Sequence, residues 1–327
     1  MSKPLSLRKK YVLEFSPKTP FNFDATMHKP DHFPSRDNEW QPGIRWQAML
    51  WKGEVLGLKF ENQGTIERPR FTVSIWSKGK LAQSFLDSLT AEINYRYNLQ
   101  IDLTAFNRRF KCGPLLGSII RRWNGMRPLN YSSLYEYLII AIVLQNATVR
   151  RSVNMMQALF ESYGTLLSYD DKEFYCFWSP ETIDKATEQD LRNLKIGYRA
   201  KSIKRVTEAF MKREIDEYEL RARTLDEQRQ VLLRLYGVGP ASVGYILFDV
   251  FHWWDELSYI SPWEQKIYSK LFFGKEPTEP VSMQELMDFF KRRFYGYKML
   301  AVHYIWEDLF WRRKNNKIPW LERLIRL

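Results

Sequence analysis

A very short connection between two apolar helical segments constrains the fold of this chain most. The helical patterns over 225–236 and 240–251 are separated only by Gly237-Val238-Gly239. Gly237 lets the chain reverse direction without a Cβ clash, and Pro240 suits the first turn of a helix, where no N–H donor is needed. The bare backbone at Gly239 leaves the first N–H groups of the second helix open to a phosphate. The segment therefore predicts a tight helical hairpin. Its turn is either purely structural or binds a phosphate without regard to base sequence.

The pattern of the chain changes near residue 105. Before this point, short segments rich in β-branched and aromatic residues predict strands at 11–15, 44–51, 55–60 and 71–76, with a hairpin turn at 52–54 and an amphipathic helix at 80–97. From residue 106 onward the apolar spacing is helical throughout. We therefore predict an α+β chain, with a small N-terminal antiparallel β domain (1–105) and a large all-helical domain (106–327).

The charge balance points to a polyanionic partner. Lys and Arg total 50 against 38 Asp and Glu, a formal net charge of +12. This favours nucleic acid first and an anionic membrane surface second. The two cysteines form no C-x-x-C pattern, which indicates a reducing compartment and excludes a four-cysteine cluster. No signal-type apolar stretch opens the chain, and the longest apolar run, 138–144, is too short for a bilayer. We expect an intracellular protein of the cytoplasm, nucleoid or nucleus, with no membrane association.

A second motif follows the hairpin. The segment 261–268 (SPWEQKIY) opens another helix and places an acid, Glu264, at its start. Together, the hairpin and this acid resemble the helix-hairpin-helix (HhH-GPD) DNA glycosylase superfamily, in which L-x-G-V-G precedes a helix that begins with an acid. In that family apolar residues follow the acid at +3 and +4, and here these are Ile267 and Tyr268. The resemblance implies that Glu264 stands where the family has its catalytic aspartate.

Other segments extend the resemblance along most of the chain, in the same order. The apolar helix 134–144 followed by Gln145-Asn146 resembles the family's buried helix, which ends in a polar pair close to the opened DNA. The segment 191–201, which contains Gly-Tyr-Arg with Arg199, resembles the element ahead of the hairpin. The segment 21–24 and the strands after it are similar to the N-terminal domain of one branch, that of 3-methyladenine DNA glycosylase II and 8-oxoguanine DNA glycosylase.

The resemblance implies removal of a damaged base that is flipped out of duplex DNA. A carboxylate beneath the sugar would stabilise the positive charge that develops as the N-glycosidic bond breaks. Ser261-Pro262-Trp263-Glu264 is also an S-x-x-E capping box, which would by itself account for a Glu at this position. Glu264 is therefore a catalytic acid, a helix cap, or both. Asp255 and Glu256 in the preceding loop are weaker candidates.

Further positions follow from the same resemblance. Bifunctional members place a lyase lysine two residues after the second glycine, where this chain has Ala241, so we predict a monofunctional enzyme. Tyr245, Trp263 and Trp306 would line the base pocket, or form part of the core. The expected DNA-binding residues are Gly237, Val238, Gly239, Ala241, Gln145, Asn146 and Arg199.

No nucleotide-binding motif is present and the histidines show no metal-ligand spacing, so we expect neither a cofactor nor a metal. The expected partner is double-stranded DNA that contains a damaged base, bound by a monomer. An alkylated purine is the favoured substrate. The alternatives are an 8-oxoguanine-type glycosylase and a non-catalytic protein that binds damaged DNA.

Overall fold

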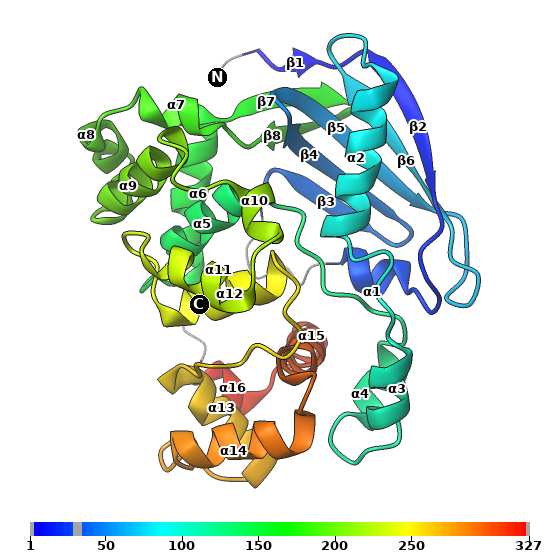
Figure 1. The fold of residues 1–327 in the computed structure, drawn as a ribbon, viewed down its shortest axis with the longest axis vertical. Helices are drawn as coiled ribbons and strands as arrows, with labels where there is room; N and C mark the ends of the chain where they lie inside the picture. The colour runs from blue at the N-terminus through cyan, green and yellow to red at the C-terminus, as the bar shows by residue number, and fades with distance from the viewer. Residues whose placement is uncertain (1–2, 29–34, 325–327) are drawn as a thin grey trace. The chain divides into compact units, whose positions relative to one another are not determined.

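The computed structural model describes residues 3–28 and 35–324, and the chain divides into two compact units (Figure 1). Unit 1 comprises residues 1–102, 125–220 and 235–237. Unit 2 comprises residues 103–124, 221–234 and 238–327. Both β-sheets belong to unit 1, and the elements found in unit 2 are helices.

Unit 1 is built on a five-stranded antiparallel sheet with the order β2-β6-β5-β4-β3. The strands are β2 (Lys9–Phe15), β3 (Asn38–Gln41), β4 (Ile44–Trp51), β5 (Glu54–Asn62) and β6 (Phe71–Ser77). Four of them contain the segments that the sequence predicts as strands, and these predictions are confirmed. Trp51 pairs with Glu54, so the β4–β5 turn consists of Lys52 and Gly53, both at positive φ, as primed hairpin turns require.

Successive side chains of a strand point to opposite faces of the sheet. Both faces of this sheet carry apolar side chains, and both are covered. On one face, Leu56, Leu58 and Phe60 of β5 share a buried cluster with Leu89 and Ile93 of helix α2 (Gln83–Arg96). Figure 1 shows α2 lying across the strands. On the other face, Trp46 and Trp76 pack against a second sheet of three short strands.

This second sheet corrects the expectation that the chain is helical from residue 106 onward. Its strands β7 (Thr165–Tyr169) and β8 (Lys172–Cys176) form an antiparallel hairpin, and β1 (Leu5–Ser6) pairs with β7 in parallel. Asp170 and Asp171, both at positive φ, make the turn. Five-residue strands are too short for an amphipathic period to stand out in a helical region, and burial against the first sheet stabilises them.

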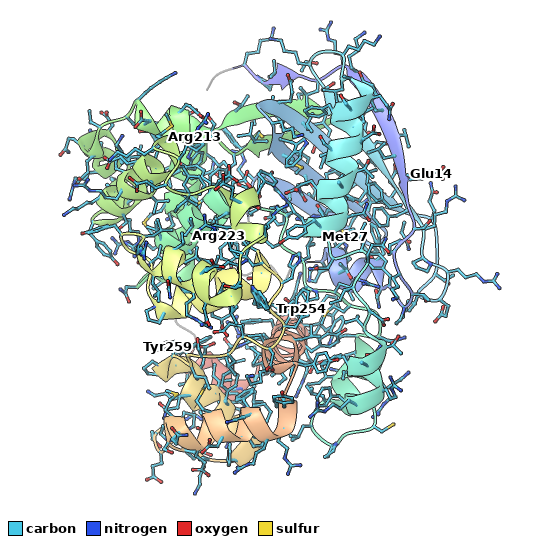
Figure 2. All side chains as sticks on the ribbon, in the orientation of Figure 1. Glu14, Met27, Arg213, Arg223, Trp254 and Tyr259 are labelled. Carbon is cyan, nitrogen blue, oxygen red and sulfur yellow. The ribbon has the colours of Figure 1, made fainter. Side chains whose placement is uncertain are left out.

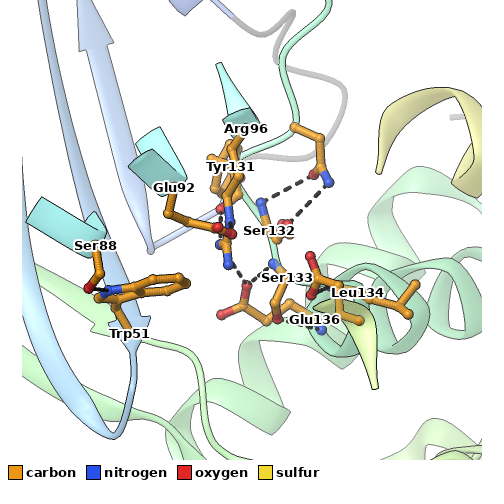
Figure 3. A network of polar contacts seen from close by, with 11 residues as sticks. Trp51, Ser88, Glu92, Arg96, Tyr131, Ser132, Ser133, Leu134 and Glu136 are labelled. Carbon is orange, nitrogen blue, oxygen red and sulfur yellow. Dashed lines mark hydrogen bonds and ion pairs between the residues drawn. The ribbon is translucent and has the colours of Figure 1, made fainter. Parts of the chain in front are cut away.

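The remaining elements of unit 1 are helical. They are α1 (Phe23–Met27), α5 (Leu134–Leu144), α6 (Val149–Tyr163), α7 (Pro180–Asp184), α8 (Glu188–Leu191), the π-helical segment η1 (Arg192–Ile196), α9 (Arg199–Met211) and α10 (Glu217–Arg221). Helix α5 is buried, as its composition predicts, and it begins at a capping box between Ser133 and Glu136. Figure 3 shows this start beside the buried Glu92–Arg96 ion pair.

Unit 2 contains α3 (Thr104–Phe110), α4 (Gly117–Arg122), α11 (Leu225–Leu233), α12 (Pro240–Asp249), α13 (Pro262–Phe273), α14 (Met283–Phe294), α15 (Lys298–Asn315) and α16 (Pro319–Glu322). Helices α11 and α12 form the predicted hairpin. Trp254 and Tyr259, labelled in Figure 2, lie on the segment between α12 and α13. In the described part of the chain, no helix combines the length and apolarity needed to cross a membrane.

Candidate active site

The turn between α11 and α12 requires glycine at its first position. Gly237 has φ +83°, a conformation that L side chains rarely adopt. A Cβ placed there would also lie 2.6 Å from Oγ of Ser202, on α9. The backbone carbonyl of Gly237 accepts a hydrogen bond of 2.7 Å from Nε2 of Gln145. Gly237 is therefore packed closely against α9 and hydrogen-bonded to the residue that follows α5.

Gly239 differs from Gly237 in its surroundings. It is the N-cap of α12 with ordinary extended backbone angles, and a Cβ placed on it would meet nothing within 4 Å. No side chain caps the helix, and Pro240 occupies its first turn. The first N–H groups of α12, those of Ala241 and Ser242, are therefore left without a side-chain acceptor beside an open backbone. Val238 is buried, so only its backbone is suited to contact a phosphate.

Gln145, Asn146 and Arg199 come together at the C-terminal end of α5. Asn146 is exposed, has φ +49°, and its Nδ2 lies 3.4 Å from the hydroxyl of Tyr198. Arg199 is only 1% exposed, and its Nη2 donates to the backbone carbonyl of Gln145. In this structure Arg199 therefore holds the α5 end in place, and its guanidinium is not presented on the surface as the sequence suggests.

Two exposed tyrosines beside this group are not singled out by the sequence. Tyr198 is 53% exposed and Tyr236 is 49% exposed. The guanidinium of Arg199 lies 4.7 Å from the ring of Tyr198, and Nζ of Lys201 lies 5.1 Å from the ring of Tyr236. Exposed aromatic rings of this kind are a common stacking surface for nucleic-acid bases. In the sequence, Tyr198 lies within the Gly-Tyr-Arg segment and Tyr236 directly precedes the hairpin glycine Gly237, and nothing else marks them.

Glu264 caps its own helix. Its Oε2 accepts a hydrogen bond of 2.8 Å from the backbone N–H of Ser261, and its own N–H donates to Oγ of Ser261 at 3.3 Å. The capping box that the sequence predicts is therefore confirmed. The Glu264 side chain is 7% exposed, so its carboxylate lies in a largely desolvated setting.

The second oxygen of Glu264 faces two phenols. Oε1 accepts a hydrogen bond from the hydroxyl of Tyr245, on α12, and lies 3.5 Å from the hydroxyl of Tyr268, one turn further along α13. Nε1 of Trp306 donates to the same Tyr268 hydroxyl at 2.9 Å. Burial, and secondarily the negative charge of Glu264, raises the pKa of Tyr268 well above its ordinary value. Tyr268 is therefore a protonated phenol at neutral pH.

The aromatic residues predicted for a base pocket form a stack in unit 2. Trp306, on α15, lies parallel to Trp263 and also stacks on Phe310. Trp306 is buried, whereas Trp263 is 37% exposed and its Nε1 donates to the carbonyl of Leu324. Since Trp306 is buried, Trp263 is the indole of this stack that a flat ligand can reach.

The weaker acid candidates are engaged in ion pairs. Asp255 contacts Nζ of Lys298 at 2.5 Å, and Glu256, which is buried, contacts Nη2 of Arg229 at 2.8 Å. None of the ion pairs found among residues 3–28 and 35–324 involves Glu264. The same residues contain no cluster of three or more His, Cys, Asp or Glu side chains that would hold a metal ion.

The chain is similar to known proteins in sequence and in fold. No family model matches the chain. The chain is 22% identical to a DNA-3-methyladenine glycosylase of Bacillus subtilis over 162 residues, which cover 49% of this chain and 54% of that protein. It is 25% identical to a probable N-glycosylase/DNA lyase of Methanothermobacter thermautotrophicus over 269 residues, which cover 76% of this chain and 81% of that protein. The match therefore spans about half the length of the first relative.

Solved structures share the fold over nearly the whole chain. A 3-methyladenine DNA-glycosylase from Archaeoglobus fulgidus superimposes with a TM-score of 0.70 at 18% identity, covering 94% of this chain and 100% of that one. An 8-oxoguanine glycosylase/lyase from Clostridium acetobutylicum gives 0.67 at 18% identity, covering 93% and 98%. The chain is thus similar in sequence to two DNA glycosylases, and it shares its fold with solved structures of DNA glycosylases. The resemblance that the sequence motifs indicate is thereby confirmed, and it includes relatives of both the 3-methyladenine and the 8-oxoguanine type.

Proposed function

We propose that this chain is a monofunctional DNA N-glycosylase of base excision repair, with alkylated purines in duplex DNA as its favoured substrates. The C1′–N bond breaks and the base leaves with the bonding electron pair, while a water oxygen forms the new bond to C1′ and loses a proton. A cationic alkylated purine leaves as a neutral base. The product is an abasic site with an intact backbone.

The placement of Glu264 carries this proposal. The carboxylate begins the helix that follows the hairpin, and the Tyr245 bond ties it directly to α12, the second helix of that hairpin. It is buried and has no cationic partner among the described residues, so its negative charge is available to a developing oxocarbenium ion. The open backbone at Gly239 and the uncapped N–H groups of α12 suit a DNA phosphate.

Two observations support the finer assignments. Ala241 occupies the position where the bifunctional members of the resembling family carry a lyase lysine, which supports hydrolysis without strand cleavage. The exposed indole of Trp263 supports a cationic purine, because stacking a cation on an aromatic face contributes about 0.5–2 kcal/mol. An 8-oxoguanine-type substrate is the alternative within the class, and it requires polar groups that read the oxidised edge of the base.

Two contacts of Glu264 favour a non-catalytic role. Oε2 of Glu264 is committed to the capping box, and Oε1 is held by Tyr245, so the carboxylate already has a structural role. A chain that uses Glu264 only in this way would bind damaged DNA through the hairpin and excise nothing.

Glu264→Gln separates charge from capping, because glutamine also closes an S-x-x-E/Q capping box. Duplex oligonucleotides with one methylated purine or one 8-oxoguanine are incubated with each protein and then treated with alkali, which cleaves abasic sites. We expect alkali-dependent breaks with the wild type on the alkylated duplex, and a rate lower by about 10²- to 10³-fold in Glu264→Gln.

Each other outcome contradicts a stated part of the proposal. Equal rates in the two proteins would remove Glu264 from catalysis, and breaks without alkali would contradict monofunctional hydrolysis. Activity on the 8-oxoguanine duplex alone would favour the alternative substrate. Tight binding with no abasic site on either lesion would favour the non-catalytic role.

A further inference from the structure

The most unusual feature of the site is the set of groups that hold the Glu264 carboxylate. Each of its oxygens has its own kind of donor. Oε2 is bonded to the backbone N–H of Ser261, while Oε1 faces the hydroxyls of Tyr245 and Tyr268. The three donors come from the N-cap of α13, from α12 and from the next turn of α13. Both oxygens of the carboxylate are therefore held by neutral groups.

The direction of the hydrogen bond from Tyr268 follows from Trp306. An indole N–H donates only, so Nε1 of Trp306 donates its proton to the Tyr268 oxygen at 2.9 Å. The Tyr268 proton is then free to point at Oε1 of Glu264. The stacking of Trp306 on Trp263 and on Phe310 fixes that indole in place. The result is a chain of donors from Trp306 through Tyr268 to Glu264.

We propose that Tyr245 and Tyr268 are positioning residues, which fix the Glu264 carboxylate for catalysis; this inference rests on the proposed glycosylase function. Glutamate has one more rotatable bond than aspartate, so an unrestrained Glu264 would lose more conformational freedom on reaching a productive position. Two phenols and one backbone N–H remove this freedom in advance. Since all three donors are neutral, they orient the carboxylate without neutralising the charge that a cationic sugar requires.

Tyr245→Phe and Tyr268→Phe remove one hydroxyl each and keep the rings. Base excision is measured under single-turnover conditions for both variants, for Glu264→Gln and for the Tyr245→Phe/Glu264→Gln double variant. We expect each tyrosine variant to be slower by about tenfold, with an unchanged dissociation constant for the DNA. We expect the double variant to be no slower than Glu264→Gln alone, because the tyrosine acts only through this carboxylate. Tyr295→Phe, at a residue that is 65% exposed, is the matched control.

A structural role of Tyr245 would give a different pattern. In that case the losses from Tyr245→Phe and Glu264→Gln would multiply, and DNA binding would weaken as well. Either result, or unchanged excision in both tyrosine variants, would overturn the positioning role.

A measurement without catalysis keeps this inference separate from the proposed function. The free energy of unfolding is determined for wild type, Tyr245→Phe, Glu264→Ala and their double variant. We expect the two single effects to be non-additive, because each removes the same hydrogen bond. A chain that shows this coupling but excises no base contradicts the proposed function alone. Additive effects contradict the positioning contact, whatever the activity.

Discussion

Trp263 lies parallel to Trp306, with ring centroids 5.2 Å apart and ring planes at 6°. Phe310 also stacks on Trp306, with ring centroids 5.1 Å apart. Trp306 is 8% exposed and Trp263 is 37% exposed, so the stack ends in one accessible indole. We therefore propose that the base contacts Trp263, which is exposed, and not Trp306, which is buried.

The first prediction concerns this accessible indole. Trp263→Leu removes the aromatic face, whereas Trp263→Phe keeps one; both variants lose the hydrogen bond to the Leu324 carbonyl, so that loss is matched. We expect Trp263→Leu to excise a cationic methylated purine about tenfold more slowly than Trp263→Phe, because the cation–π contribution is lost. Single-turnover excision measures the difference. Equal rates in the two variants would argue against stacking on Trp263.

The second prediction contrasts the two glycines of the hairpin. Gly237→Ala places a Cβ 2.6 Å from Oγ of Ser202 at φ +83°, so we expect it to lower the free energy of unfolding by about 1–3 kcal/mol. Gly239→Ala meets no atom within 4 Å and keeps an ordinary backbone conformation, so its stability should change by less than about 1 kcal/mol.

For DNA binding we expect Gly239→Ala to have a clear effect, although this substitution hardly changes stability. A Cβ at Gly239 blocks close approach of a phosphate to the start of α12, so Gly239→Ala should weaken binding to damaged and undamaged duplexes alike. Fluorescence anisotropy with both duplexes measures this, beside thermal unfolding. Wild-type affinity in Gly239→Ala would contradict the phosphate contact.

The third prediction separates the two roles of Glu264 by stability. Glu264→Ala loses the side-chain half of the capping box and the acceptor for Tyr245, so we expect a loss of about 1 kcal/mol or more in unfolding free energy. Glu264→Gln retains a capping side chain and should lose less. Chemical denaturation of the three proteins gives the comparison. If Glu264→Gln and Glu264→Ala lower the free energy of unfolding equally, a neutral capping side chain contributes nothing to stability.

The start of α5 supplies a test of pH dependence. Glu136 accepts a hydrogen bond of 2.5 Å from the backbone N–H of Ser133, and Nη1 of Arg96 lies 4.0 Å from the same carboxylate. Figure 3 shows these groups together. The same Arg96 is paired with Glu92 at 2.6 Å. Burial raises the pKa of Glu136 above its ordinary value of 4.5, and this effect outweighs the attraction of Arg96.

The fourth prediction follows from the sign of this shift. Because folded Glu136 binds a proton more readily than unfolded Glu136, its contribution to stability is favourable at low pH and declines as pH rises from about 4.5 through the raised value. Glu136→Gln keeps the capping box and removes this titration. We expect the variant to be at least as stable as wild type at pH 7 and to gain stability relative to it as pH rises. If the difference in unfolding free energy between wild type and Glu136→Gln does not change with pH, the raised pKa of Glu136 is contradicted.

Much of the fold was readable from the sequence because the signals are local. The β4–β5 hairpin follows from Lys52 and Gly53, and the capping box at Ser261 follows from two residues three positions apart. The hairpin at Gly237 follows from a turn that only glycine makes without strain. In each case the interacting groups are neighbours in the chain, so their chemistry can be read without knowing the fold.

The missed features depend on contacts distant in sequence. The β7–β8 hairpin is stabilised by packing against the large sheet, and the burial of Arg199 depends on the carbonyl of Gln145, 54 positions away. The bond from the Tyr245 hydroxyl to Glu264 joins residues 19 positions apart, while the place of the Tyr245 ring in the base pocket stays a prediction. Tyr268 carried a weak local signal, because it lies four residues after Glu264 on the same helix face.

The α+β class, the hairpin, the acid at the start of the next helix and the glycosylase resemblance all follow from the sequence, because each is set by residue types at short spacing. The donors that hold the acid and the exposed indole of the stack are known only from the folded chain. Hydrogen bonds and burial join residues that the chain brings together only when it folds, and no short segment records them.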